Sequence, residues 1–122
     1  MIMYETIFYS DANGNEPIKD FLDELEKKSK TDKNSRINRN KIIAYINLLE
    51  KHGTSIGEPV VKHLRDDIWE LRPLRNRILF ATYKGNIYLL THHFIKKTQK
   101  TPPNEIKQAE RLLKDYKERN EI

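Results

Sequence analysis

Three strand-length runs follow one another in the second half of the chain, and they limit the folds that it can adopt. The runs are Ile68 to Arg72, Arg77 to Tyr83 and Ile87 to Ile95, and each is rich in β-branched and aromatic residues. The tripeptide 84–86, Lys-Gly-Asn, separates the last two runs and is typical of a tight hairpin turn. Because consecutive strands joined by short turns pair antiparallel, the sequence predicts a small antiparallel sheet.

The N-terminal third predicts one more strand and two helices. Met3 to Ser10 has the composition of a strand and ends at a dense turn signal. Apolar residues at helical spacing predict a helix that begins at Pro17 and a second helix from about Arg36 to His52, which Gly53 would end. The short polar segment Ser29 to Ser35 connects them, so we expect a helical hairpin.

The remaining segments complete a single domain of residues 1–122. Gly53 to Asp67 has no clear period and is predicted to be a connecting loop. Pro102 and Pro103 stop the last strand and begin a third helix. The apolar stripe of that helix consists of Ile106, Ala109, Leu113 and Tyr116. The expected fold is α+β with the order β-α-α-β-β-β-α.

Length and composition exclude several classes of protein. A chain of 122 residues buries one core and is too short for two domains. It contains no cysteine, which excludes disulfides, thiolate catalysis and zinc-thiolate sites and fits a reducing compartment. No window approaches the roughly 18 apolar residues of a membrane-spanning helix, and the N-terminus has no signal-peptide pattern. We therefore expect a cytosolic protein that does not enter the membrane.

Positive charge is concentrated on the predicted strands. Nine Lys or Arg but only three Asp or Glu lie between Pro59 and Thr101, so this window carries +6, while the rest of the chain sums to −1. Each phosphate that a basic side chain neutralises releases counterions and adds affinity, whatever the base sequence. The window is therefore predicted to bind a polyanion, although a basic surface also suits an anionic membrane or an acidic protein.

Two arginines on neighbouring strands are the strongest candidates for chemistry. Side chains in a strand alternate between faces, so Arg72 shares a face with Glu70. A hairpin after Arg72 would bring Arg77 close to it across the pair. Two converging guanidinium groups can hold one phosphate and stabilise the charge of a pentacoordinate phosphorus. On composition alone, a surface ion pair between Arg72 and Glu70 is the more common explanation of such a pattern.

The histidines do not form a metal site. His92 and His93 are adjacent on one strand and point to opposite faces, so only one of them can join the basic face. His52 ends a helix and His63 lies in the predicted loop, and neither has the spacing of a metal motif. We therefore expect no metal and no cofactor, and a single histidine is most often only hydrogen-bonded or solvated.

Several other side chains in the basic window are candidates for contact with RNA. Lys96 and Lys97 follow the last strand in a charge run that is equally typical of a solvated segment or a phosphate contact. The further candidate RNA-binding residues are Lys62, His63, Arg65, Arg75, Gln99 and Lys100. Tyr83 and Tyr88 can stack on a base, although aromatic residues at strand spacing more often belong to the core. Three aromatic residues, Tyr4, Phe8 and Trp69, are assigned to the core.

A set of short runs resembles one family. These runs are Trp69 to Arg72, Arg77 to Phe80, Leu90 to Phe94 and Lys96 to Pro102, together with the helix that follows. Over nearly the whole chain they resemble the phage-derived branch of the RelE/HigB toxin family. The resemblance implies a small antiparallel sheet backed by two N-terminal helices. It also implies a type II toxin that cleaves mRNA on the ribosome and is silenced by a cognate antitoxin, expected to carry a helix-turn-helix DNA-binding domain.

The resemblance assigns roles to particular residues. Arg72 and Arg77 match strand arginines that stabilise the transition state, and Lys96 and Lys97 match paired lysines that bind phosphate or act as acid or base. His92 matches a histidine that carries a proton. The implied reaction needs no metal and leaves a 2′,3′-cyclic phosphate and a 5′-hydroxyl.

Two other classes of function use the same basic face. A non-catalytic nucleic-acid-binding protein would use it for affinity alone. A purely structural protein would use it to dock an acidic chain.

Overall fold

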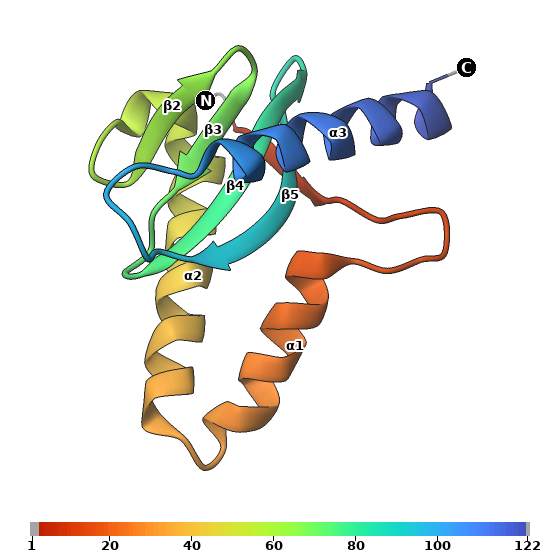
Figure 1. Cartoon of the computed structure of the whole chain (residues 1–122). Helices are drawn as coiled ribbons and strands as arrows, with labels where there is room; N and C mark the ends of the chain where they lie inside the picture. Colours follow the sequence, from red (N-terminus) through yellow and green to blue (C-terminus); the bar gives the residue numbers. More distant parts are fainter. Residues whose placement is uncertain (1–2, 122) are drawn as a thin grey trace.

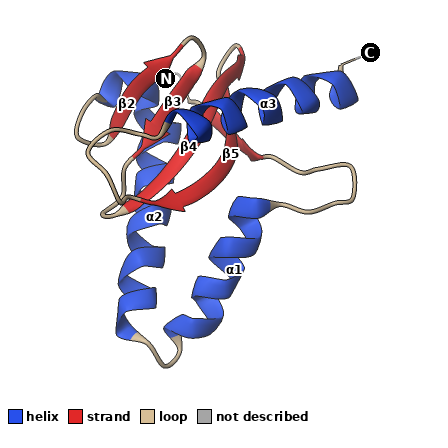
Figure 2. Cartoon of the chain, in the orientation of Figure 1, coloured by secondary structure: helices blue, strands red, loops and turns tan. Residues whose placement is uncertain are grey.

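The strands form one mixed sheet in the computed structural model, which describes residues 3–121 (Figure 2). The sheet has five strands in the order β1-β5-β4-β3-β2. Their bounds are β1 (Glu5–Phe8), β2 (Val61–Arg65), β3 (Ile68–Leu71), β4 (Asn76–Lys84) and β5 (Ile87–Ile95). β2, β3, β4 and β5 pair antiparallel in sequence order, and the predicted hairpin at Lys84-Gly85-Asn86 joins β4 to β5.

Three α-helices and one short 3-10 helix complete the chain. They are α1 (Pro17–Ser29), α2 (Lys33–His52), η1 (Gly53–Ile56) and α3 (Pro103–Asn120). α2 begins earlier than predicted because the Asp32 side chain accepts a hydrogen bond from the backbone N–H of Asn34 and caps the helix there. Gly53 ends α2 with φ of 64°, as predicted from its lack of a side chain. No helix within residues 3–121 is long and apolar enough to cross a membrane.

The sheet carries helices on both faces, and each face has its own apolar core (Figure 1). α1 and α2 cover one face, where the fully buried residues include Ile18, Ile42, Leu49, Leu71, Ile78 and Phe80. α3 covers the other, where the buried residues include Leu79, Ala81, Leu89, Ala109 and Leu113. The alternation of Ile78, Leu79 and Phe80 between the two cores is the alternation that a strand imposes.

The positions of three aromatic residues confirm their predicted assignment to the core. Tyr4, Phe8 and Trp69 pack against the core beneath α1 and α2, as predicted. Tyr88 belongs to the same core and is 5% exposed, while Tyr83 packs edge-on against Tyr116 beside α3. Neither Tyr83 nor Tyr88 therefore lies open for stacking on a base.

Three details differ from the sequence predictions. The predicted loop from Gly53 to Asp67 contains η1 and the edge strand β2, which pairs with β3 through Val61 opposite Leu71 and His63 opposite Trp69. The sheet is not wholly antiparallel, because β1 pairs parallel with β5. The sheet also packs against α3 as well as the two N-terminal helices. The hairpin of α1 and α2 carries the chain from β1 at one edge of the sheet to β2 at the other, so β1 is left to pair with the last strand, β5.

Candidate active site

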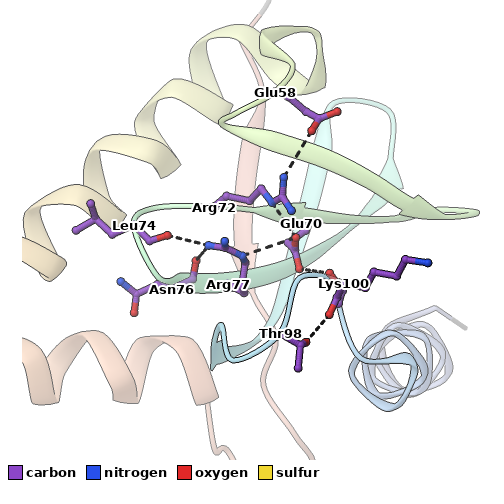
Figure 3. A network of polar contacts seen from close by, with 9 residues as sticks. Glu58, Glu70, Arg72, Leu74, Asn76, Arg77, Thr98 and Lys100 are labelled. Carbon is purple, nitrogen blue, oxygen red and sulfur yellow. Dashed lines mark hydrogen bonds and ion pairs between the residues drawn. The ribbon is translucent and has the colours of Figure 1, made fainter.

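Two arginines lie together at the turn between β3 and β4 (Figure 3). Arg72 follows the last residue of β3, and Arg77 is the second residue of β4. Leu71 and Ile78 are partners across the two strands, so the next pair outward is Arg72 and Arg77. Both side chains therefore lie on the face of the sheet that α3 covers, as the alternation of the strands predicted.

A buried carboxylate joins the two arginines. Glu70 is 1% exposed, and its Oε1 accepts a hydrogen bond of 3.0 Å from Nε of Arg72 and lies 3.9 Å from Nε of Arg77. Its Oε2 accepts a hydrogen bond of 2.6 Å from Oγ1 of Thr101. A buried charge is costly unless it is paired and hydrogen-bonded, and these contacts meet that requirement. Glu70 thus orients both guanidinium groups and ties them to the segment that follows β5.

Arg77 is the more constrained of the two arginines. Its NH1 donates to the backbone carbonyls of Leu74 and Asn76 at 2.9 and 2.8 Å. Leu74 has φ of 62°, a conformation that a non-glycine residue adopts at a cost of about 1–2 kcal/mol and that is found most often at functional sites. Burial lowers the pKa of Arg77, and the charge of Arg72 lowers it further while that of Glu70 raises it. The guanidinium remains a cation at neutral pH.

Each arginine keeps one nitrogen available for a ligand. Arg72 uses Nε on Glu70, and its NH1 lies 3.6 Å from Oε1 of the exposed Glu58. Arg77 uses Nε on Glu70 and NH1 on backbone carbonyls. Among residues 3–121, NH2 of neither guanidinium has a hydrogen-bond partner. Two free donors on fixed cations suit a phosphate.

The arginines line a groove between the sheet, the segment after β5 and the start of α3. The groove has a volume of about 250 Å³, and Glu70, Arg72, Arg77 and Glu105 line it together with Phe94 and residues 95–102. A second hollow of about 380 Å³ adjoins it and shares Arg77, Lys96, Lys97, Thr98 and Gln99. We call the groove and the hollow together the basic groove.

Five of the predicted site residues beyond the arginines line the basic groove. Lys96, Lys97, Gln99 and Lys100 come from the segment after β5. Arg75 comes from the β3–β4 turn, and its NH2 donates to the carbonyl of Lys96 at 3.1 Å, while its own carbonyl accepts from the Lys96 backbone N–H at 2.8 Å. The turn and the segment are therefore held together as one basic wall.

The structure does not bring the predicted residues of β2 to the groove. Arg65 forms an ion pair of 2.6 Å with Glu110 of α3, and His63 hydrogen-bonds the Asp66 carbonyl at 2.7 Å. Lys62 is exposed on the same strand and is the partner of Glu70 in the pairing of β2 with β3. These three side chains lie on the outer edge of the sheet.

A comparison with known protein families matches the part of the chain that contains this whole site. Residues 20–114 match the family described as "Phage derived protein Gp49-like (DUF891)". The chain belongs to the Gp49-like family. This family is a phage-derived, HigB-like branch of the RelE toxin superfamily, so the resemblance of the strand and lysine runs is confirmed. No curated protein matches the chain.

In this Gp49-like chain His92 lies behind the groove. Its Nε2 is 3.0 Å from Oε1 of Glu105 on α3, and its Nδ1 is 3.2 Å from Oγ1 of Thr91. The Thr91 hydroxyl donates to the Leu79 carbonyl, so it faces the histidine as an acceptor. Burial lowers the pKa of His92, and the hydrogen bond with Glu105 opposes that effect. Glu105 lines the groove, and it connects the buried ring to the groove surface.

His93 belongs to the opposite face, as the alternation of β5 predicted. Its ring stacks on Phe21 of α1 with centroids 3.7 Å apart, and its Nε2 bonds Oδ1 of Asn76 at 3.0 Å. Burial lowers the pKa of His93 to about 4, so the ring is neutral at physiological pH. His93 thus packs the α1 hairpin against the sheet and does not reach the basic groove.

Sequence reasoning missed two acidic residues of the Gp49-like site. Glu70 was expected only as an exposed partner of Arg72, whereas it is buried and contacts both arginines. Glu105 was not singled out, because an acidic residue in the first turn of a helix is ordinary. The motif pattern alone gave no signal for Glu105, since its contact with His92 depends on how α3 packs. No group of three His, Asp or Glu residues within 3–121 is arranged to hold a metal ion.

Proposed function

We propose that this chain is a ribosome-dependent mRNA endoribonuclease, the toxin of a type II toxin–antitoxin pair. The observation that carries the proposal is the convergence of Arg72 and Arg77 on one buried carboxylate at the floor of the basic groove. Membership of the Gp49-like toxin family supports it independently. A site of this kind presents fixed positive charge where a phosphodiester would develop negative charge.

In the proposed reaction the scissile phosphate binds through its non-bridging oxygens to NH2 of Arg72 and NH2 of Arg77. A base removes the proton of the adjacent ribose 2′-OH, and the 2′-oxygen forms a bond to phosphorus. The bond from phosphorus to the 5′-oxygen then breaks, and an acid protonates that oxygen. The products are a 2′,3′-cyclic phosphate and a 5′-hydroxyl. Donors held in place before the reaction commonly contribute about 10²–10³ to kcat.

The proton carriers are proposed from the groove lining. Lys96 and Lys97 stand on the wall of the groove, where each can bind phosphate or transfer a proton. His92 reaches the groove only through Glu105, so the pair would act as a unit with the Glu105 carboxyl group at the groove surface. The remaining RNA-binding candidates, Arg75, Gln99 and Lys100, would contact nucleotides that flank the cleaved bond. We propose that Lys62, His63 and Arg65 contact RNA farther from the cleaved bond.

The proposed partner in the resting cell is a cognate antitoxin with a helix-turn-helix DNA-binding domain. The toxin family implies an antitoxin. A groove with this concentration of Lys and Arg suits an acidic segment that competes with RNA. Co-expression with the adjacent open reading frame should relieve growth inhibition and yield a complex on purification.

The deciding experiment is cleavage of a defined mRNA on programmed ribosomes. The wild type and the Arg72→Ala/Arg77→Ala double variant are compared, and the cut positions and end groups are mapped. Cuts confined to the translated frame that end in cyclic phosphate and vanish in the double variant would establish the nuclease. Intact mRNA despite measurable binding would identify a non-catalytic RNA-binding protein. Cleavage that persists in the double variant would show that the reaction occurs elsewhere.

A further inference from the structure

The outer face of α2 has an unusual charge composition. Its exposed basic residues are Lys33, Arg36, Lys41 and Lys51, and its exposed amides are Asn34, Asn40 and Asn47. Glu50 is the single acidic residue of α2, and its side chain is partly buried and accepts a hydrogen bond of 2.6 Å from Thr6. Lys33, Asn40, Asn47 and Lys51 recur at helical spacing, so they form one stripe along the helix, and Arg36 and Lys41 flank this stripe on its two sides.

The other two helices balance their charge more closely than α2 does: α1 has four acidic and three basic residues, α3 has four and five, and α2 has one and five, without counting histidine. α1 contains the i,i+4 pairs Lys19–Asp23 and Lys28–Glu24, and α3 contains Lys114–Glu118 and Arg119–Asp115. In the described part of the chain, no carboxylate lies within ion-pair distance of the four exposed basic residues of α2. Helix solvation alone does not require this composition, because α1 and α3 also have exposed faces with more closely balanced charge.

Stabilisation of the helix does not explain Lys33 either, whereas NH1 of Arg36 donates at 3.1 Å to the Ser29 carbonyl at the end of α1 and so also holds the hairpin together. Lys33 and Arg36 lie in the first turn of α2, which has no acidic residue, while α1 has Asp20 and α3 has Glu105 in that place. The positive end of the helix dipole disfavours a cation there by about 0.3–1 kcal/mol. Lys33, which opposes the stability of α2 and contacts no carboxylate within residues 3–121, is better explained by a ligand that it binds.

We infer that the outer face of α2 is a second RNA-binding surface, distinct from the basic groove. Its ligand is the phosphate and ribose backbone of structured RNA, which lysine, arginine and asparagine side chains bind without reading the sequence. From Lys33 to Lys51 the stripe is about 27 Å long at 1.5 Å per residue, which is enough to contact several phosphates. This inference rests on the proposed function, since it is the proposed action on the ribosome that supplies structured RNA.

Hydrogen bonds connect α2 to Arg77, while the outer face of α2 and the basic groove lie on opposite sides of the sheet. Asn38 of α2 accepts a hydrogen bond of 2.8 Å at its Oδ1 from Nδ2 of the buried Asn76. The carbonyl of Asn76 in turn accepts from NH1 of Arg77. The hairpin of α1 and α2 extends away from the sheet, so the N-terminal half of α2 is accessible along its outer face (Figure 1).

The test measures binding of a short RNA duplex, which offers no translated message, as a function of salt. The Lys33→Gln/Arg36→Gln/Lys41→Gln variant should bind more weakly, and the slope of log K against log salt should fall by about 2 to 3, because each lost phosphate contact removes about 0.7–0.9. The matched control is Lys84→Gln/Lys114→Gln/Lys117→Gln, which removes the same charge near the C-terminal end of α3. Its slope should stay within about one of the wild type.

The comparison of salt slopes requires that the α2 variant folds. The α2 variant should melt close to the wild-type temperature, because removing two cations from the positive end of the dipole offsets the loss of the exposed hydrogen bond from Arg36 to the Ser29 carbonyl. If the triple variant does fail to fold, the single Lys33→Gln variant should lower the slope by about one. Equal slopes for the wild type and a folded α2 variant would overturn the inference. So would loss of antitoxin binding with RNA binding intact, because α2 would then be a protein-docking face.

The outcomes distinguish a failure of this inference from a failure of the nuclease proposal. The Arg72→Ala/Arg77→Ala variant should retain the part of duplex binding that depends on α2. A wild type that binds the duplex through α2 but cleaves no mRNA would refute the nuclease and keep the second surface. If the α2 variant cleaves mRNA on ribosomes and binds the duplex as the wild type does, the second RNA-binding surface is refuted and the nuclease proposal is kept.

Discussion

The carboxylate of Glu70, almost wholly buried, accepts a hydrogen bond of 3.0 Å from Nε of Arg72. This contact fixes the orientation of the guanidinium at the basic groove, which Arg72 lines. The second oxygen of Glu70 holds Thr101, so one side chain links the arginines to the lysine-bearing segment. The order of the site therefore depends on a residue that is itself inaccessible to a substrate.

Replacement of this carboxylate should disorder the arginines. Glu70→Gln preserves the shape but presents an NH2 group to Thr101 or to a guanidinium, which leaves a buried donor unpaired. We expect a loss of about 1–3 kcal/mol in the free energy of unfolding and a fall in kcat. Urea denaturation and mRNA cleavage measure the two effects. Glu58→Gln is the matched control, because Glu58 is exposed and 3.6 Å from Arg72, and it should change stability by less than about 1 kcal/mol. Equal stabilities for the two variants would contradict the assigned role of Glu70.

A positive charge alone should not support catalysis at positions 72 and 77. Lysine keeps the cation in Arg72→Lys and Arg77→Lys, but it cannot donate to Glu70 and to a phosphate in a planar geometry. Arg77→Lys also loses the bonds to the carbonyls of Leu74 and Asn76. We expect kcat on programmed ribosomes to fall by about 10²–10³ in each variant. RNA affinity and its salt slope should change little. Wild-type turnover in either variant would favour a simple electrostatic role.

The contact of Thr101 with Glu70 should hold the wall of the groove in place. Thr101→Val removes the hydroxyl that donates at 2.6 Å and leaves an oxygen of Glu70 unsatisfied. We expect a loss of about 1–2 kcal/mol, measured by thermal or urea unfolding. Thr98→Val is the control, since the Thr98 hydroxyl bonds only the exposed carbonyl of Lys100, and water can replace it there. A larger loss in Thr98→Val than in Thr101→Val would show that the buried contact is unimportant.

Stability should decline in mildly acidic solution because of His93. Its pKa is about 4 in the folded chain and near 6.5 in the unfolded chain, so the folded state favours the neutral ring. The resulting stability is complete above pH 6.5 and is lost as the pH falls toward 4. His93→Gln keeps a donor for Asn76 but does not titrate, so its urea midpoint should vary less between these pH values. Burial also lowers the pKa of His92, so part of the pH dependence of stability should remain in the variant. An identical pH profile in the variant would refute this assignment.

Local signals explain which parts of the fold were predictable. Pro17 and Pro103 begin helices, and Lys84-Gly85-Asn86 turns one strand into the next, because each residue type restricts its own backbone. The strand Val61–Arg65 lacked such signals, since it is an edge strand that forms by pairing with β3. The parallel pairing of β1 with β5 depends on the path of the chain through α1 and α2, and no local sequence pattern predicts that path.

For the site, the sequence by itself determined the kinds of side chain and their faces. Strand alternation is a property of the backbone, so it placed Arg72 and Arg77 on one face and separated His92 from His93. Only the tertiary structure decided that Glu70 is buried between the arginines and that Glu105 covers His92. Burial and contact between distant segments depend on how α3 and the segment after β5 pack on the sheet. That packing is set by the whole apolar core, so no short stretch of sequence contains it.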